Sequence, residues 1–384
     1  MIIKESIWSK LTYWFRDRWR RVDIFDETLA PNNKRNPAYY IGSLLYISLI
    51  IQILIGTILA IYYVPTFDGA YKSITYITEK LLLFGFPIGF WLRNLHRYLA
   101  DAVIILAIVR VFRFYFTADF KKPNELSWIL SIIFLLFSTV FGFSGYVLPL
   151  DQRAYWATTI GTAFPLAIDQ MPLIGNLRLG SLLSFIARGG PVLNQNTLTR
   201  FYALHYIFPL LIMIFVEFFF YFKRKKRINI PVLAIIIFAI IILFVGKIFP
   251  AVSEAPATPD NPPFHILPDW YFLFVYYLLK IMPLLIGILF NFGFIIFVAL
   301  MPWIETNSYK QARKRPLWIL LGALGILLFL ILSYRSAKIS DTVLLKTDIP
   351  YIILSYVIII LIGGFMQWRV KINERKKFKL VEQK

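Results

Sequence analysis

Apolar runs of about 20 residues recur along this chain, and they constrain its fold more than any other feature. A helix of that length spans the hydrocarbon core of a bilayer, which is ~30 Å thick. Hydrophobic residues make up 59% of the 384 residues, a share that argues against an ordinary soluble domain. The sequence therefore predicts an all-α integral membrane protein.

Eight of these runs are expected to cross the membrane. They cover residues 39–63, 91–116, 126–148, 199–222, 231–249, 283–303, 316–333 and 349–368. The apolar segment 269–282 is too short to cross and carries Lys280, so it is expected to lie at the surface or to re-enter the membrane. Three regions follow from this pattern: an N-terminal segment 1–38, a four-helix bundle 39–222, and a C-terminal region 223–384 with four further spans.

Two segments outside the spans are also expected to be helical. Residues 1–21 mix tryptophans with basic residues, which predicts an amphipathic helix on the membrane surface. Residues 149–198 contain too much Gly, Pro and Asp for another span, so short surface helices are expected there.

The basic residues indicate the orientation of the chain. With eight crossings, about two-thirds of the 41 Lys and Arg fall on the side that holds both termini. The positive-inside rule places that side, and both termini, in the cytoplasm, with the protein in the cytoplasmic membrane. The net charge of +20 is then a topology signal, and no nucleic-acid partner is expected. Since the chain has no Cys, it forms no disulfide and supplies no thiolate ligand to a metal or an iron–sulfur cluster.

Two histidines lie inside predicted spans. His96 is about one turn into its span and His205 about two turns into its own. A polar ring in hydrocarbon costs free energy unless it is paired, so such a histidine favours a ligand or proton-relay role; a hydrogen-bonded histidine inside a bundle is the alternative. Both spans run from outside to inside, which puts the two imidazoles at similar depth in the outer leaflet. That placement fits axial ligation of a haem iron.

Several motifs resemble those of cytochrome b from quinol–cytochrome c reductases, and they extend over nearly the whole chain. They are Asn36 to Leu45, Ile50 to Gly56, Arg93-x-x-His96 with Ala100, Gly145 to Gln152 with Tyr155-Trp156, Leu198 to His205, and Pro262 to Phe274. The resemblance implies a membrane-embedded subunit of a respiratory complex that passes electrons from quinol to a b-type haem and an iron–sulfur partner. A membrane anchor that no longer turns over quinol is the alternative.

The resemblance also assigns roles to single residues. It implies that His96 and His205 ligate the haem iron, that Gly56 and Gly145 let haem edges approach the backbone, and that Arg93 pairs with a propionate. It implies that Asp269 accepts a proton from quinol and that Tyr146 and Tyr271 line the quinol pocket. The alternatives are an interface anchor for Arg93, a helix N-cap for Asp269, and interfacial packing for the tyrosines.

The expected partners follow from the same resemblance. They are a Rieske-type iron–sulfur protein, a c-type cytochrome or another electron-accepting subunit, quinol, and membrane lipid. A multisubunit complex is expected, with a dimer as one option. His265 is expected near the docking surface of the iron–sulfur partner.

The departures from the family pattern are as informative as the matches. The family has a second histidine 14 residues after each of the first two, about 21 Å further along the helix. Arg110 and Phe219 stand at those positions here, and Ser131 stands where the family has a glycine 14 residues before Gly145, although Gly42 is kept. Leu150 also replaces the family's usual Trp beside the quinol pocket.

These departures predict a single haem, in the outer site, with the inner pocket closed by protein. The aromatic residues expected to fill it are Phe112, Phe114, Phe218, Phe219 and Phe220. Arg110 then needs a partner at membrane depth, and Glu217 is the candidate; snorkelling of Glu217 to the interface is the alternative.

Overall fold

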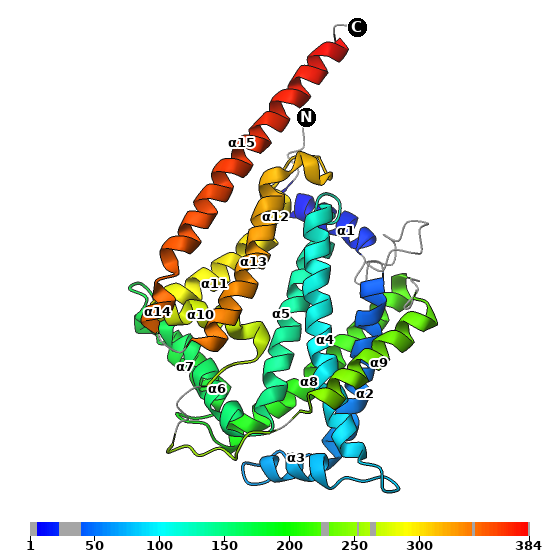
Figure 1. The fold of residues 1–384 in the computed structure, drawn as a ribbon, viewed down its shortest axis with the longest axis vertical. Helices are drawn as coiled ribbons and strands as arrows, with labels where there is room; N and C mark the ends of the chain where they lie inside the picture. Colours follow the sequence, from blue (N-terminus) through cyan, green and yellow to red (C-terminus); the bar gives the residue numbers. More distant parts are fainter. Residues whose placement is uncertain are drawn as a thin grey trace. The chain divides into compact units, whose positions relative to one another are not determined.

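A computed structural model describes residues 6–22, 40–223, 230–251, 253–261, 266–339 and 342–382, and over these ranges the chain is helical without a β-strand (Figure 1). The longer helices are α1 (Ile7–Arg21), α2 (Ile41–Tyr62), α4 (Ile88–Thr117), α5 (Glu125–Val147), α8 (Gln195–Lys223), α9 (Val232–Ile248), α11 (Leu284–Ala299), α13 (Pro316–Lys338) and α15 (Ile349–Glu382). The shorter ones are α3 (Ala70–Glu79), α6 (Gln152–Ala163), η3 (Phe164–Gln170), η4 (Gly175–Leu177), α7 (Leu179–Arg188), η5 (Trp270–Phe272), α10 (Leu273–Ile281), α12 (Met301–Ile304), η6 (Ala312–Lys314) and α14 (Thr342–Lys346).

The all-helical class is confirmed, whereas the count of eight crossings stays a prediction. Among the described residues, five helices are long and apolar enough to cross a bilayer: α2, α5, α8, α13 and α15. Helix α4 is 30 residues long but carries several charged side chains. Helices α9 and α11 have 17 and 16 residues, fewer than the ~20 that a crossing needs.

The expected short and peripheral helices are present. The segment after α5 folds into α6, η3, η4 and α7, and the nine-residue α10 is too short to cross. Helix α1 starts at a Ser6 cap and leaves Ile7, Trp8 and Phe15 exposed. Its Arg18 forms an ion pair with the buried Glu125 of α5 at 3.2 Å. An exposed apolar face on a basic helix agrees with the predicted location on the membrane surface.

The chain divides into two compact units, and α4 and α5 contribute to both. Unit 1 contains residues 1–22, 111–130 and 269–384. Unit 2 contains residues 23–110 and 131–268. Unit 2 therefore holds α2, α3, α6 to α9, the first part of α4 and most of α5, and with them both intramembrane histidines.

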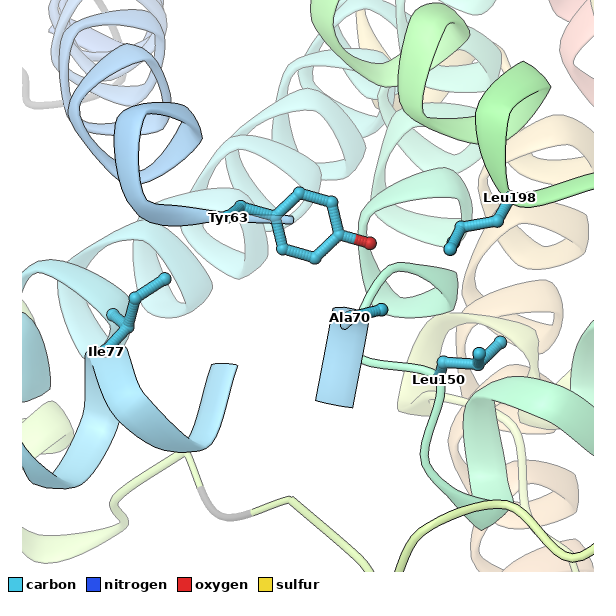
Figure 2. Packing of buried hydrophobic residues seen from close by; sticks show 5 residues of the cluster. All are labelled: Tyr63, Ala70, Ile77, Leu150 and Leu198. Carbon is cyan, nitrogen blue, oxygen red and sulfur yellow. The ribbon is translucent and has the colours of Figure 1, made fainter. Parts of the chain in front are cut away.

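A hydrophobic cluster in unit 2 joins the end of α2 to the segment that follows α5. Figure 2 shows its five buried residues, Tyr63, Ala70, Ile77, Leu150 and Leu198. The Tyr63 ring projects from the end of α2 towards the side on which Leu150 and Leu198 lie, and its hydroxyl donates to the Leu148 carbonyl at 2.8 Å. Since Tyr63 follows Gly56 by two turns and Leu148 follows Gly145 closely, this cluster fixes the ends of the helices that carry both glycines.

Unit 1 is tied together by a buried group of charges. Glu305 accepts two hydrogen bonds of 2.5 Å from Arg315 and one of 2.9 Å from the Lys121 ammonium. Lys121 also donates to the Asn307 and Tyr309 carbonyls, so its buried charge is surrounded by oxygen. Burial nevertheless lowers the pKa of Lys121, although Glu305 opposes this shift. The group connects the α4–α5 loop to the segment between α12 and α13.

Candidate functional site

The structure brings His96 and His205 together in unit 2. Their ring centroids are 6.0 Å apart and the ring planes meet at 78°. His96 is the ninth residue of α4 and His205 the eleventh of α8, because these helices begin at Ile88 and Gln195, earlier than the sequence predicted. Both rings still lie in the amino-terminal half of their helices, at one level, as expected.

Each imidazole packs against a glycine on a neighbouring helix. A Cβ added to Gly56 of α2 would lie 2.9 Å from Cε1 of His96, and one added to Gly145 of α5 would lie 2.6 Å from Cε1 of His205. Non-bonded carbon atoms prefer about 3.5–4.0 Å, so a larger residue at either position would push the ring away. The two predicted glycines therefore adjoin the two histidines, and in this structure the imidazole rings themselves lie against them.

A cavity of about 480 Å³ opens beside the two rings. Helices α2, α4, α5 and α8 all contribute to its lining, which includes both histidines, both glycines, Arg93 and Tyr146. Cofactor pockets in proteins have volumes of about 300–1,000 Å³ and mostly apolar walls with a few polar groups. The cavity has the size and the lining of such a pocket.

The polar part of the lining centres on Arg93. Its guanidinium donates to the Thr78 hydroxyl at 2.8 Å and to the Ser253 hydroxyl at 2.7 Å, both neutral acceptors. The neighbouring Glu254 pairs with Arg153 at 3.2 Å, and its backbone N–H donates to Asp151 at 3.0 Å. Arg93 is thus fixed at the cavity by hydroxyl groups, which leaves its positive charge able to bind a carboxylate.

The second nitrogens of the two imidazoles differ in their surroundings. Nδ1 of His205 lies 3.2 Å from the Phe141 carbonyl oxygen and 3.0 Å from the Ser144 hydroxyl oxygen. Nδ1 of His96 is buried and has no hydrogen-bond partner in the described part of the chain. Sequence reasoning missed Ser144; its signal was a polar residue directly before Gly145 in an apolar helix.

These residues fit the b-type haem that the sequence predicts. A bond from a metal to an imidazole nitrogen is about 2 Å long, so two imidazoles on opposite sides of one ion have centroids about 6 Å apart. An edge-to-face ring pair without a metal also falls in this range. It does not account for the adjoining cavity or for the two glycines.

Asp269 and Tyr271 lie in unit 1, at the start of α10. Asp269 is 3% exposed and stands at the N-cap position of η5, where its side chain makes no capping hydrogen bond. Tyr271 is also buried, and its hydroxyl lies 3.3 Å from a carboxylate oxygen of Asp269. Tyr146 belongs to unit 2, where it lines the cavity. His265 lies outside the described residues.

The positions where the family has its second histidine pair are filled by protein. Arg110 is 2% exposed and Phe219 is 4% exposed, and neither lines the cavity. Glu217, two residues before Phe219, accepts a hydrogen bond from the Tyr46 hydroxyl of α2. The pairing of Arg110 with Glu217 stays a prediction.

The phenylalanines expected to close this region differ in their exposure and in their packing partners. Phe218 is 56% exposed, so the prediction that it helps to fill the inner pocket is wrong. Successive helix residues differ in direction by about 100°, and three consecutive phenylalanines cannot all face inwards. Phe114 is fully buried and packs against Trp128 in unit 1, and Phe112 packs against Phe116. The Phe220 side chain lies outside the described residues.

Two family models match the chain. Cytochrome b/b6/petB matches residues 27–227, and cytochrome b(C-terminal)/b6/petD matches residues 256–360. The cytochrome b6 of Porphyra purpurea is 36% identical over 228 residues, which are 58% of this chain and 99% of that one. A cytochrome bc complex cytochrome b subunit of Chlorobaculum thiosulfatiphilum is 30% identical over 371 residues, 86% of this chain and 82% of that one.

A solved structure has a similar fold. A chain described as hyperthermophilic respiratory Complex III superposes with a TM-score of 0.73 at 21% sequence identity. The match covers 94% of this chain and 99% of that chain. At this identity the likeness concerns the fold, which therefore extends over nearly the whole length.

Proposed function

Because this chain belongs to the cytochrome b family, whose members are membrane subunits of bc-type electron-transfer complexes, we propose that it holds one b-type haem between His96 and His205. The observation that carries the proposal is the pair of imidazoles 6.0 Å apart, each against a glycine, beside a cavity of about 480 Å³. When bound, the haem supplies one-electron transfer.

The chain's own residues prepare this site. His96 and His205 offer ring nitrogens from α4 and α8, and most of the remaining lining is apolar. Arg93, fixed by Thr78 and Ser253, provides a positive charge for a carboxylate.

Quinol oxidation is proposed on the outer side, close to Asp269. Oxidation of quinol to quinone releases two electrons and two protons. Asp269 is a buried carboxylate beside the Tyr271 hydroxyl and accepts one of the protons, and water on the outer side takes the other. One electron passes to a Rieske-type iron–sulfur protein, which delivers it to a c-type cytochrome or another accepting subunit. A haem held by His96 and His205 would take the other electron. Tyr146 lines the quinol pocket in this proposal.

Orientation and assembly complete the proposal. The chain crosses the cytoplasmic membrane eight times with both termini in the cytoplasm, as its basic residues indicate. It works within a multisubunit complex, with a dimer as one arrangement.

One haem per chain interrupts the usual route across the membrane. With Arg110 and Phe219 buried at the second ligand positions, this chain would offer no second pair of imidazoles to hold an inner haem, and the electron would have no further haem in this chain to reach. It leaves through a centre in another subunit or returns to the outer side. The isolated subunit therefore reduces no quinone on the cytoplasmic side.

Haem stoichiometry tests the proposal directly. The purified chain is expected to bind one haem and to titrate in one redox step. Two haems per chain, or two steps from a single polypeptide, would contradict the closed inner level. A chain that binds no haem would contradict the site itself.

Replacing the Asp269 carboxylate tests whether the chain takes part in quinol oxidation or only anchors a complex in the membrane. Asp269→Asn is expected to slow quinol oxidation by about 10²-fold or more while haem content stays unchanged, because an amide cannot act as the base. An unchanged rate would favour a role as a membrane anchor, the second candidate function. The burial of Asp269 and Tyr271 beside each other supports the catalytic role.

A further inference from the structure

The contacts of His205 single out a residue that the family resemblance does not assign. Ser144 is fully buried on α5, and its hydroxyl donates to the Phe141 carbonyl one turn earlier at 3.0 Å. The same hydroxyl oxygen lies 3.0 Å from Nδ1 of His205 on α8. The Phe141 carbonyl oxygen lies 3.2 Å from that nitrogen as well.

These two oxygens decide which nitrogen of His205 carries the proton. A carbonyl oxygen accepts hydrogen bonds and cannot donate one. With Nδ1 deprotonated, two lone pairs would face each other across 3.2 Å at Phe141. With Nδ1 protonated, the N–H is shared between the carbonyl and Ser144, whose own proton already points to Phe141. The geometry therefore favours the Nδ1–H tautomer, which leaves the lone pair on Nε2.

We propose that Ser144 is a positioning residue that, together with the Phe141 carbonyl, holds His205 in the Nδ1–H tautomer with Nε2 free for the haem iron, and that it makes the two histidine ligands unequal. The inference rests on the proposed haem site and deepens it. A hydrogen-bond acceptor at the second nitrogen of a ligating imidazole fixes the ring and raises the basicity of the ligand. His205 has two such acceptors, and His96 has none in the described part of the chain.

Gly145 makes this contact possible. Its missing Cβ is the reason that the His205 ring can lie against the α5 backbone, within reach of both oxygens. Ser144 and Gly145 thus act as one unit: the glycine provides space and the serine provides an acceptor.

The first test replaces the acceptor. Ser144→Ala is expected to weaken haem binding about tenfold, and to shift the midpoint potential upwards because a less basic imidazole stabilises the ferric iron less. Ser144→Thr keeps a hydroxyl and should restore both values. Thr139→Ala is the matched control, since Thr139 makes the same type of bond to a carbonyl one turn earlier on α5 and faces away from His205.

The second test measures the inequality between the ligands. In His205→Gly, 4-methylimidazole should restore the low-spin spectrum about two- to tenfold better than 1-methylimidazole, which has no N–H to donate. In His96→Gly the two compounds should restore it to within about twofold, because no acceptor faces the second nitrogen there. Adding Ser144→Ala to His205→Gly should reduce the preference for 4-methylimidazole.

The outcomes distinguish the role of Ser144 from the haem site on which that role rests. If the wild-type chain binds no haem, the haem site itself is wrong. If it binds haem and Ser144→Ala matches Thr139→Ala in affinity and potential, Ser144 has no positioning role. If Ser144→Ala does not fold, the comparison can be made between Ser144→Val and Ser144→Thr, whose side chains have the same shape. Equal haem affinity and equal midpoint potential in these two variants would overturn the inference.

Discussion

Two levels of the same helices differ in whether their residues line the cavity of unit 2. The histidine level, formed by Gly56, His96, Gly145 and His205, adjoins a cavity of about 480 Å³. The arginine level, formed by Gly42, Arg110, Ser131 and Phe219, lies 14 residues further along α4 and α8, and none of its four residues lines that cavity.

The difference lies in a few residues at the arginine level. The arginine level keeps one of the family's glycines, Gly42, and it is buried like Ser131, Arg110 and Phe219. Two large side chains and one serine stand where the family has two imidazoles and a glycine. Protein interiors pack densely, so larger side chains at these positions take up space that smaller ones would leave.

The largest effect is expected from the ligands of the histidine level. His96→Ala or His205→Ala should abolish the low-spin b-type spectrum, because each removes an axial nitrogen. Reduced-minus-oxidised absorption of the purified chain measures this loss. His265→Ala, which changes the remaining one of the three histidines, is the control and should keep the spectrum. Full haem retention in His205→Ala would show that the ligand is elsewhere.

A large loss of stability is expected at the arginine level. Arg110→Leu should lower the free energy of unfolding by about 3–5 kcal/mol if it leaves a buried carboxylate without its counter-charge. Denaturation in detergent micelles measures it, and Lys310→Met, at a surface ion pair, should cost less than about 1 kcal/mol. If Glu217 is the partner, adding Glu217→Gln to Arg110→Leu should recover part of the loss. Strictly additive effects would remove Glu217 from that role.

Replacing a glycine by alanine is expected to weaken haem binding by an amount that depends on the position. Gly145→Ala, whose Cβ would lie 2.6 Å from His205, is expected to weaken haem binding about 10- to 100-fold, since overpacking costs about 1–3 kcal/mol. Gly56→Ala should cost less, because its Cβ would lie 2.9 Å from His96. Gly293→Ala meets nothing within 4 Å and is the control for haem titrations. Equal affinities in all three variants would mean that the rings do not need this space.

The smallest effect is expected from the phenol at the arginine level. Tyr46→Phe removes the hydroxyl that donates to Glu217 and should cost about 1 kcal/mol of unfolding free energy. Haem content should not change, because Tyr46 does not line the cavity. Tyr351→Phe, at an exposed ring, serves as the reference. A loss of haem in Tyr46→Phe would mean that the two levels are coupled.

The parts of the fold that follow from local pattern were predictable from the sequence. Hydrophobic runs placed the long helices, and the depth of His96 and His205 placed the two rings at one level. Helix ends were less accurate: α15 continues to Glu382, 14 residues beyond the predicted end at Trp368. The residues after Trp368 are mostly Lys, Arg, Glu and apolar side chains, which form helices well although the hydrophobic signal stops there.

Contacts between distant segments were not predictable in this way. Ser144 and His205 are 61 positions apart, and nothing in their local sequences states that they meet. The same holds for Lys121 and Glu305, whose pairing depends on the packing of unit 1. Periodicity indicates which face of a helix is buried, but it does not indicate which residue of another helix will lie opposite.

The buried charge group of unit 1 has a consequence for the order in which the chain is made. Lys121 and Glu305 are 184 positions apart, and at about 5–20 residues per second roughly 10–40 s pass between their syntheses. Throughout that interval the Lys121 ammonium has to remain in water, because its counter-ion does not yet exist. The α4–α5 loop therefore reaches its final packing only after the chain has grown past Arg315, late in translation.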